Sequence, residues 1–224
     1  MKKNIIIFCA HSDDQVLGAG GAMAKYAREG YNIYTYIFSF GELSHPHLKA
    51  SYIKKIRTKE SEVADKIIGG KKVEFFGLKD GVMDKEIKNK NIYFKVKNII
   101  EEIKPEKIFT HSIDDMLPDH RVVRRCVIRA YDELNQEKNV KCDVYSFDVW
   151  NILNLAKRDN PILVVDISST FKHKIQALHE FKSQINIFTH AYLVNLLYLG
   201  VYIKAFVYGI RYGNKLAEIF YKIR

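Results

Sequence analysis

The sequence predicts an α/β protein in which a mainly parallel, Rossmann-like sheet carries helices on both faces, formed by a single domain over residues 1–224. Three observations favour this fold class. Short apolar runs alternate with longer stretches that have helical hydrophobic spacing. Glycines follow the first two helical stretches, where helices commonly end. With 224 residues, 47% of them hydrophobic, the chain is large enough for a complete core.

The predicted elements follow one another in the order expected for a doubly wound sheet. The predicted strands are apolar runs at residues 5–9, 33–38, 73–76, 108–110, 144–149 and 162–167. The predicted helices lie at residues 16–29, 50–68, 92–103 and 119–134. The apolar stretch 191–210 contains Asn195 and Lys204. We therefore expect a buried or subunit-interface helix there, with membrane contact as the less favoured alternative and a homo-oligomer compatible with the sequence.

Charge and cysteine content restrict the partners and the compartment. Lys and Arg total 36 against 26 Asp and Glu, and the net charge of +10 favours anionic partners. The basic residues are scattered and no nucleic-acid-binding signature is present, so nucleic acid is not expected as a partner. The three cysteines lack CxxC spacing, which is typical of a reducing compartment. The amino-terminal run is better explained as a strand than as a signal peptide, so a cytoplasmic location is expected.

Polar side chains follow the first and fourth predicted strands. "AHSDDQVLGAGG" supplies His11, Asp13 and Asp14, and "THSIDDMLPDHRVV" supplies His111 and His120. Adjacent carboxylates repel each other and need a counter-charge such as a metal ion. The carboxyl ends of parallel strands meet at one edge of a sheet, so two imidazoles and a carboxylate can form a catalytic zinc site there. The alternative is that these groups are helix caps and solvated loop residues.

Two further stretches allow more than one interpretation. In "YIKKIRTKESEVADKIIGG", Arg57 and Glu60 share the apolar face of a predicted helix. Arg57 can pair with Glu60 or reach into a site. The glycines of "GAGGAMA" do not complete a dinucleotide-binding fingerprint, because Met23 occupies the third glycine position. They are better explained by close packing of a helix on a strand.

With these motifs placed, the chain resembles the LmbE-like, or PIG-L, family of zinc-dependent N-acetylglucosaminyl deacetylases. "AHSDDQVLGAGG" corresponds to the family's opening "AHPDDE" and glycines. "RTKE" and "FFGLKDG" correspond to RxxE and FLGxxDG, and "LPDH" corresponds to "HPDH". "KSQ" and "AEIF" match the late landmarks, so the resemblance spans nearly the whole chain.

The resemblance implies a metal-dependent N-deacetylase that hydrolyses the acetamide of an N-acetylglucosamine-type sugar or sugar conjugate. It implies that His11, Asp14 and His120 bind Zn²⁺, with Fe²⁺ or Co²⁺ as alternatives, and that Asp13 is the general base for the metal-activated water. Arg57 would contact sugar hydroxyls or a neighbouring anionic group. The expected partner is therefore an amino-sugar conjugate, which can be anionic.

Three positions depart from the family pattern. Ser12 replaces a proline and Gln15 replaces a glutamate, and both changes concern support of the loop. Leu117 replaces the histidine that helps hold the tetrahedral oxyanion. Loss of one such donor typically lowers the rate on the order of 10²- to 10³-fold. Asp119 matches a position that tunes the absent histidine.

An active enzyme is expected to replace the missing donor. His111 is the first candidate, followed by His45 and His47 in the connection after the second predicted strand. Two alternative functions stay open. One is hydrolysis of another N-acyl amine. The other is a catalytically impaired metal- or sugar-binding relative that lost turnover when Leu117 arose.

Overall fold

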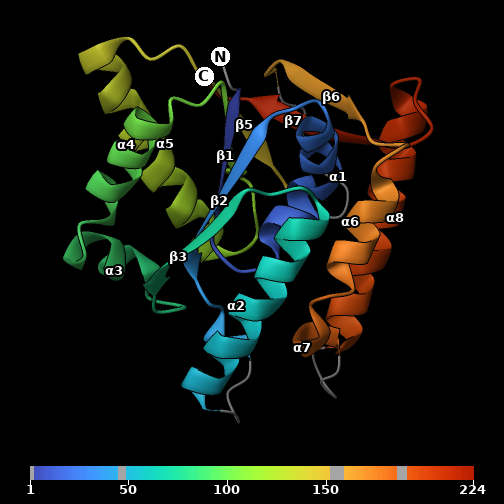
Figure 1. Ribbon diagram of the computed structural model, residues 1–224, viewed down its shortest axis with the longest axis horizontal. Coiled ribbons are helices and arrows are strands. Elements are labelled where there is room, and N and C mark those ends of the chain that lie inside the picture. Colours follow the sequence, from blue (N-terminus) through green and yellow to red (C-terminus); the bar gives the residue numbers. More distant parts are fainter. Residues whose placement is uncertain (1–2, 45–48, 152–158, 186–190) are drawn as a thin grey trace.

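A computed structural model describes residues 3–44, 49–151, 159–185 and 191–224. Within these ranges the strands form one seven-stranded sheet in the order β3-β2-β1-β4-β5-β7-β6 (Figure 1). The strands are β1 Asn4–Cys9, β2 Asn32–Ser39, β3 Lys72–Leu78, β4 Lys107–His111, β5 Asp143–Phe147, β6 Ile162–Asp166 and β7 Ala217–Lys222. Strands β1 to β5 are parallel, while β7 pairs antiparallel with both β5 and β6. The predicted fold class is confirmed, although β7 was not predicted as a strand.

Helices cover both faces of the sheet. They are α1 Asp14–Arg28, α2 Ala50–Ile67, α3 Met83–Asn89, α4 Ile92–Ile103, α5 Pro118–Lys138, α6 Phe171–Leu178, α7 Lys182–Ile185 and α8 Ala191–Arg211, with a short 3₁₀ helix η1 at Glu42–Ser44. One hydrophobic core lies between the sheet and α3, α4 and α5. The other lies between the sheet and α1, α2, α6 and α8 (Figure 1). Both faces are therefore buried, as in a doubly wound α/β fold.

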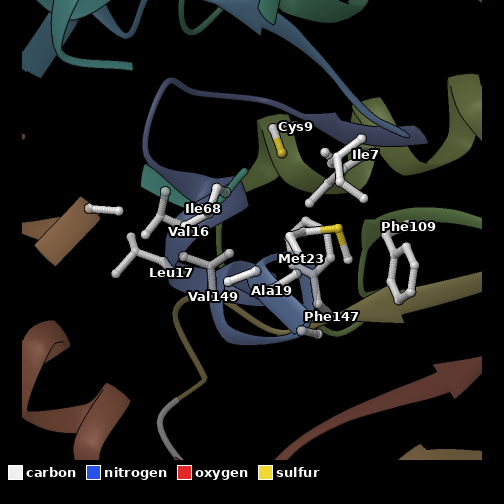
Figure 2. Packing of buried hydrophobic residues seen from close by; sticks show 14 of the residues in the cluster. Ile7, Cys9, Val16, Leu17, Ala19, Met23, Ile68, Phe109, Phe147 and Val149 are labelled. Atoms are coloured by element: carbon white, nitrogen blue, oxygen red, sulfur yellow. The ribbon is translucent and has the colours of Figure 1, made fainter. Parts of the chain in front are cut away.

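The glycines of α1 permit close packing, as the sequence predicted. A Cβ atom on Gly18 would lie 2.2 Å from a ring carbon of Phe147 in β5. A Cβ atom on Gly21 would lie 2.9 Å from Ile167, directly after β6. Figure 2 shows Phe147 in the same cluster as the α1 side chain Met23. Helix α1 can therefore lie directly on the sheet, which fixes the position of its first residues.

Helix α8 occupies the long apolar stretch near the carboxyl end. Leu197 and Val201 are buried in the core, whereas Leu199, Phe206 and Ile210 are 54%, 57% and 64% exposed. In the described part of the chain, no helix combines the length and apolar character needed to cross a bilayer. Contact of α8 with a membrane or with a second subunit stays a prediction.

The topology brings two predicted polar clusters together. Strands β1 and β4 are hydrogen-bonded neighbours, although β2, β3, four α-helices and η1 separate them in the sequence. From β1 the chain continues to β2 on one side, while β4 lies on the other side. This is the topological switch point of a doubly wound sheet, where ligands bind at the carboxyl ends of strands.

Asp65 gives the fold a specific pH dependence. This α2 carboxyl is 2% exposed, and its Oδ1 accepts a hydrogen bond of 2.8 Å from Thr35 Oγ1. Burial raises the pKa of Asp65 from 3.8 to about 7, even though the Thr35 bond lowers it. The neutral acid is therefore the form that the folded state favours. Its contribution to stability is complete below the unfolded-state pKa and is lost as the pH rises through about 7.

We expect the unfolding free energy of Asp65→Asn to decrease less than that of the wild type as the pH rises. The pKa difference corresponds to about 4 kcal/mol of unfolding free energy in total, of which about 2 to 3 kcal/mol is lost between pH 5 and pH 8. Urea unfolding at pH 5 and pH 8 measures the change, with the exposed α2 substitution Glu62→Gln as the matched control. An Asp65→Asn variant that loses as much stability as the wild type over this interval would contradict the expectation.

Candidate metal centre

Three predicted ligand side chains converge at the carboxyl edge of β1 and β4. His11 follows β1, Asp14 begins α1, and His120 lies in the first turn of α5. His11 Nδ1 lies 3.3 Å from His120 Nε2 and 3.6 Å from Asp14 Oδ2. His120 Nε2 lies 3.4 Å from Asp14 Oδ2. Tetrahedral zinc with bonds near 2.05 Å has ligand–ligand edges of about 3.4 Å, so the triangle matches one face of such a site.

Each histidine of the triangle has a carboxylate behind it. His11 Nε2 and Asp80 Oδ1 are hydrogen-bonded at 3.1 Å. His120 Nδ1 lies 2.9 Å from Asp115 Oδ1. These carboxylates favour a proton on the outer nitrogen of each ring, which leaves the inner nitrogens as the atoms that can bind a cation once their own protons are displaced.

Carboxylates give the site a negative field. Burial lowers the pKa of His11, but its contacts with Asp119 and Asp80 outweigh burial and raise it to about 10. Burial likewise lowers the pKa of His120, but Asp14 and Asp115 raise it to about 9. Both rings therefore favour positive charge. A divalent ion would supply that charge while displacing the inner protons, so affinity should increase with pH.

The chemistry of the donor set fits zinc. Two imidazole nitrogens and one carboxylate oxygen are the ligands of many catalytic zinc sites, which leave one position for water. His11, Asp14 and His120 offer one ligand atom each, and these atoms lie within 4.8 Å of one another. Asp14 is 2% exposed, and its Oδ2 also accepts the His11 backbone N–H at 2.7 Å. The central ligand is thus held by the loop that it follows.

Asp13 lies beside this triangle and is less buried than Asp14. Its side chain is 18% exposed, and its Oδ1 is 3.5 Å from Nη2 of Arg57. Burial raises the pKa of Asp13, while the Arg57 charge opposes the increase. A carboxylate with a raised pKa, next to a candidate metal, is suited to accept a proton from water.

Arg57 is held inside the protein. It is 3% exposed, and it donates from Nε to Ser12 Oγ at 2.7 Å and from Nη1 to the Gly41 carbonyl at 3.0 Å. Glu60 instead accepts from the backbone N–H and the hydroxyl of Ser183 at 2.8 and 2.6 Å. A substrate contact by Arg57 stays a prediction, and it would involve Nη2, the nitrogen beside Asp13.

His111 is close to the centre but fully buried. Its Nε2 accepts the Ala10 N–H at 2.9 Å and lies 3.3 Å from Asp14 Oδ2, while its ring stacks on His120 with centroids 3.9 Å apart. Burial and the nearby His120 charge lower the pKa of His111 to about 4. An oxyanion donor needs an N–H directed at the substrate. The oxyanion role stays a prediction, which this geometry does not favour. His45 and His47 lie outside the described residues.

Asp80 and Asp115 contact the candidate ligands but were not predicted from the sequence to have a role. Asp80 follows β3 in "FFGLKDG", and Asp115 follows β4 in "THSIDDM". Both therefore lie at the sheet edge that carries the candidate ligands. Their place after a strand was a detectable signal, but their pairing with particular histidines depends on tertiary structure.

Replacing Asp115 tests the carboxylate behind His120. We expect Asp115→Asn to weaken zinc binding about 10- to 100-fold, because an amide stabilises the ligating histidine tautomer less than a carboxylate does. Competition with a chelating dye measures the affinity. Asp114→Asn, at the exposed neighbouring position, is the control. Equal affinities of Asp115→Asn and the wild type would show that this contact does not support the site.

The chain matches a protein family and several known proteins. The model of the family described as PIG-L: GlcNAc-PI de-N-acetylase matches residues 6–131. A probable N-acetyl-alpha-D-glucosaminyl L-malate deacetylase 2 of Bacillus cereus is 26% identical over 207 residues, which are 87% of this chain and 91% of that protein. The matched region contains all three candidate ligands.

Relatives of a second kind are hydratases. A 4-oxalmesaconate hydratase of Pseudomonas putida is 31% identical over 121 residues, which are 51% of this chain and only 45% of that protein. Among solved structures, a 4-carboxy-2-hydroxymuconate hydratase from the same species has a TM-score of 0.81 at 23% identity, and the match covers 99% of this chain and 96% of that chain. This likeness confirms the fold.

Proposed function

We propose that this chain, which belongs to the PIG-L family, is a metal-dependent hydrolase. Its proposed reaction removes the N-acetyl group from an N-acetylglucosamine-type sugar or sugar conjugate. The observation that carries the proposal is the triangle of His11, Asp14 and His120 beside the carboxylate of Asp13. Zn²⁺ held there would lower the pKa of water toward ~7 and polarise the amide carbonyl.

Asp13 and Arg57 are proposed to carry out proton transfer and positioning in this reaction. Asp13 accepts the proton of the water that attacks the carbonyl carbon, and then returns it to the nitrogen as the C–N bond breaks. The products are acetate and a free amino sugar. Arg57 lies beside Asp13 and would stabilise its ionised form and fix its direction. These groups thus serve one hydrolytic step.

The oxyanion needs a donor that Leu117 cannot provide. His111 is the proposed substitute, and to act it would have to give up the hydrogen bond that its Nε2 accepts from Ala10, carry a proton on that nitrogen and direct the N–H at the substrate. A site that lacks such a donor is expected to be slower on the order of 10²- to 10³-fold. A low kcat with normal metal binding is therefore the result expected if nothing replaces the oxyanion donor that is missing at Leu117.

Hydration of a carbon–carbon double bond is the second candidate function. It is favoured by the similarity to hydratases of Pseudomonas putida. The same water and the same base could serve an addition reaction.

Product analysis by proton NMR separates these functions. Zinc-loaded protein is incubated with N-acetylglucosamine, its malate conjugate, its phosphatidylinositol conjugate and an unsaturated dicarboxylate. Metal-dependent acetate release supports the hydrolase. Loss of vinyl signals without acetate indicates the hydratase. Stoichiometric zinc with no turnover contradicts both and favours a binding protein impaired at Leu117.

A further inference from the structure

Exposed apolar side chains lie in the connections that follow three strands at the edge of the sheet that carries the candidate ligands. Leu43, Val82, Ile113 and Met116 are 55%, 41%, 59% and 69% exposed. Each lies after a parallel strand, in the connections that follow β2, β3 and β4. These connections leave the same sheet edge that carries the candidate ligands. Exposed apolar groups gathered around a site commonly indicate a binding surface.

Leu43 is linked directly to the His11 side of the centre. Its backbone N–H donates to Asp80 Oδ2 at 3.3 Å, and Asp80 Oδ1 is hydrogen-bonded to His11 Nε2 at 3.1 Å. Its side chain lies against Gly81, where a Cβ atom would be 3.0 Å from Leu43 Cδ1. One carboxylate therefore separates this leucine from a candidate ligand.

Leu117 has the corresponding position on the His120 side. Its backbone N–H donates to Asp115 Oδ1 at 3.1 Å, and the same oxygen lies 2.9 Å from His120 Nδ1. The side chain of Leu117 is half-buried and belongs to the loop that leads into α5. The backbone of each leucine is thus fixed by a carboxylate that also contacts a candidate ligand.

We propose that Leu43, Val82, Ile113, Met116 and Leu117 form an apolar collar that receives a hydrocarbon group of the substrate close to the scissile amide. The inference rests on the proposed function and narrows its substrate class to amino sugars that carry such a group. Leucine side chains cannot form hydrogen bonds with sugar hydroxyls. Each substrate methylene that is buried against them, in contrast, can improve binding up to about fourfold. The collar is thus matched to an alkyl chain.

A hydrocarbon group can belong to the N-acyl chain or to the aglycone. Two substrate series separate these sources. One lengthens the acyl group of glucosamine from acetyl to butanoyl and hexanoyl. The other keeps the acetyl group and lengthens an alkyl glycoside from methyl to hexyl. We expect kcat/KM of the zinc-loaded protein to rise about two- to fourfold per methylene in one series.

Leu43→Ser tests the collar itself, and Leu199→Ser is the matched control. Leu199 is 54% exposed on α8, close to the 55% of Leu43, and lies outside the collar. The dependence on chain length should disappear in Leu43→Ser and persist in Leu199→Ser. The proposal is overturned if neither series shows a dependence, or if Leu43→Ser retains the full slope.

Calorimetric binding of both series to zinc-loaded Asp13→Asn separates this proposal from the proposed function. Chain-length-dependent binding without turnover of any member by wild-type protein would contradict the hydrolase and support the collar. Acetate release with no length dependence in rate or binding would support the hydrolase and overturn the collar. Self-association that Leu43→Ser abolishes, without a length dependence, would also overturn it by identifying a subunit interface.

Discussion

Replacing Asp13 by asparagine is expected to lower kcat about 10²- to 10⁴-fold while the protein still binds one zinc ion. Asparagine has nearly the same shape but cannot accept a proton from water. Asp13 is not among the three ligand atoms of the triangle, so its loss should leave them in place. Steady-state amine release, with zinc content measured on the same samples, gives both quantities.

The control for Asp13→Asn is Asp84→Asn, because Asp84 is 55% exposed on α3 and contacts only Lys88 and Arg125 in the described salt bridges. It should retain wild-type kcat. An Asp13→Asn variant with wild-type kcat would remove Asp13 from the proposed role. A variant that also loses zinc would instead indicate that Asp13 is a ligand.

The second large effect is expected from Asp14→Ala, which should lose zinc binding and activity together. Asp14 Oδ2 lies at one corner of the ligand triangle and also accepts the His11 N–H at 2.7 Å. Its removal takes away one ligand and releases the backbone that positions another. Since loss of an outer partner already weakens affinity about 10- to 100-fold, loss of this ligand should exceed 100-fold.

Zinc affinity of Asp14→Ala is measured by competition titration after circular dichroism has confirmed that the variant is folded. Asp114→Ala, at an exposed position in the loop before α5, should bind zinc normally. A folded Asp14→Ala protein that binds one zinc ion with wild-type affinity would contradict the ligand assignment.

The convergence of the candidate ligands was predictable because it depends on topology more than on detail. His11 and Asp14 follow a strand, and His120 opens the helix after another strand, so a parallel sheet brings them to one edge. The environment of His111 was not predictable in the same way. Both faces of the sheet are covered by helices, so the sequence does not indicate whether a residue at a strand end is exposed.

Strand β7 shows why part of the fold could not be predicted. Its Glu218 is 7% exposed, which interrupts the apolar pattern expected of a strand buried on both faces. That carboxylate accepts Lys174 Nζ at 2.6 Å and the backbone N–H of Ala22 at 2.7 Å. The groups that stabilise the buried Glu218 carboxylate belong to α6 and α1, which are far from β7 in the sequence. A buried ion pair of this kind is visible only once the chain is folded.

The contacts of Asp80 and Asp115 with the histidines also depend on residues that are far apart in the sequence. Asp80 and Asp115 stand after strands, but their contacts join β3 to the loop after β1, and the loop after β4 to α5. No spacing rule connects such pairs. Together with Asp119 and Asp14, these two carboxylates raise the pKa values of His11 and His120.

The most direct measurement of the central claim is a titration of chelator-treated protein with Zn²⁺, in which bound zinc and the rate of amine release from an N-acetylated amino sugar are followed together. One metal held by His11, Asp14 and His120 predicts no rate at the start, a linear rise, and a plateau at one equivalent. Amine release by the metal-free protein, or release that does not follow bound zinc, would contradict a hydrolysis that depends on this centre.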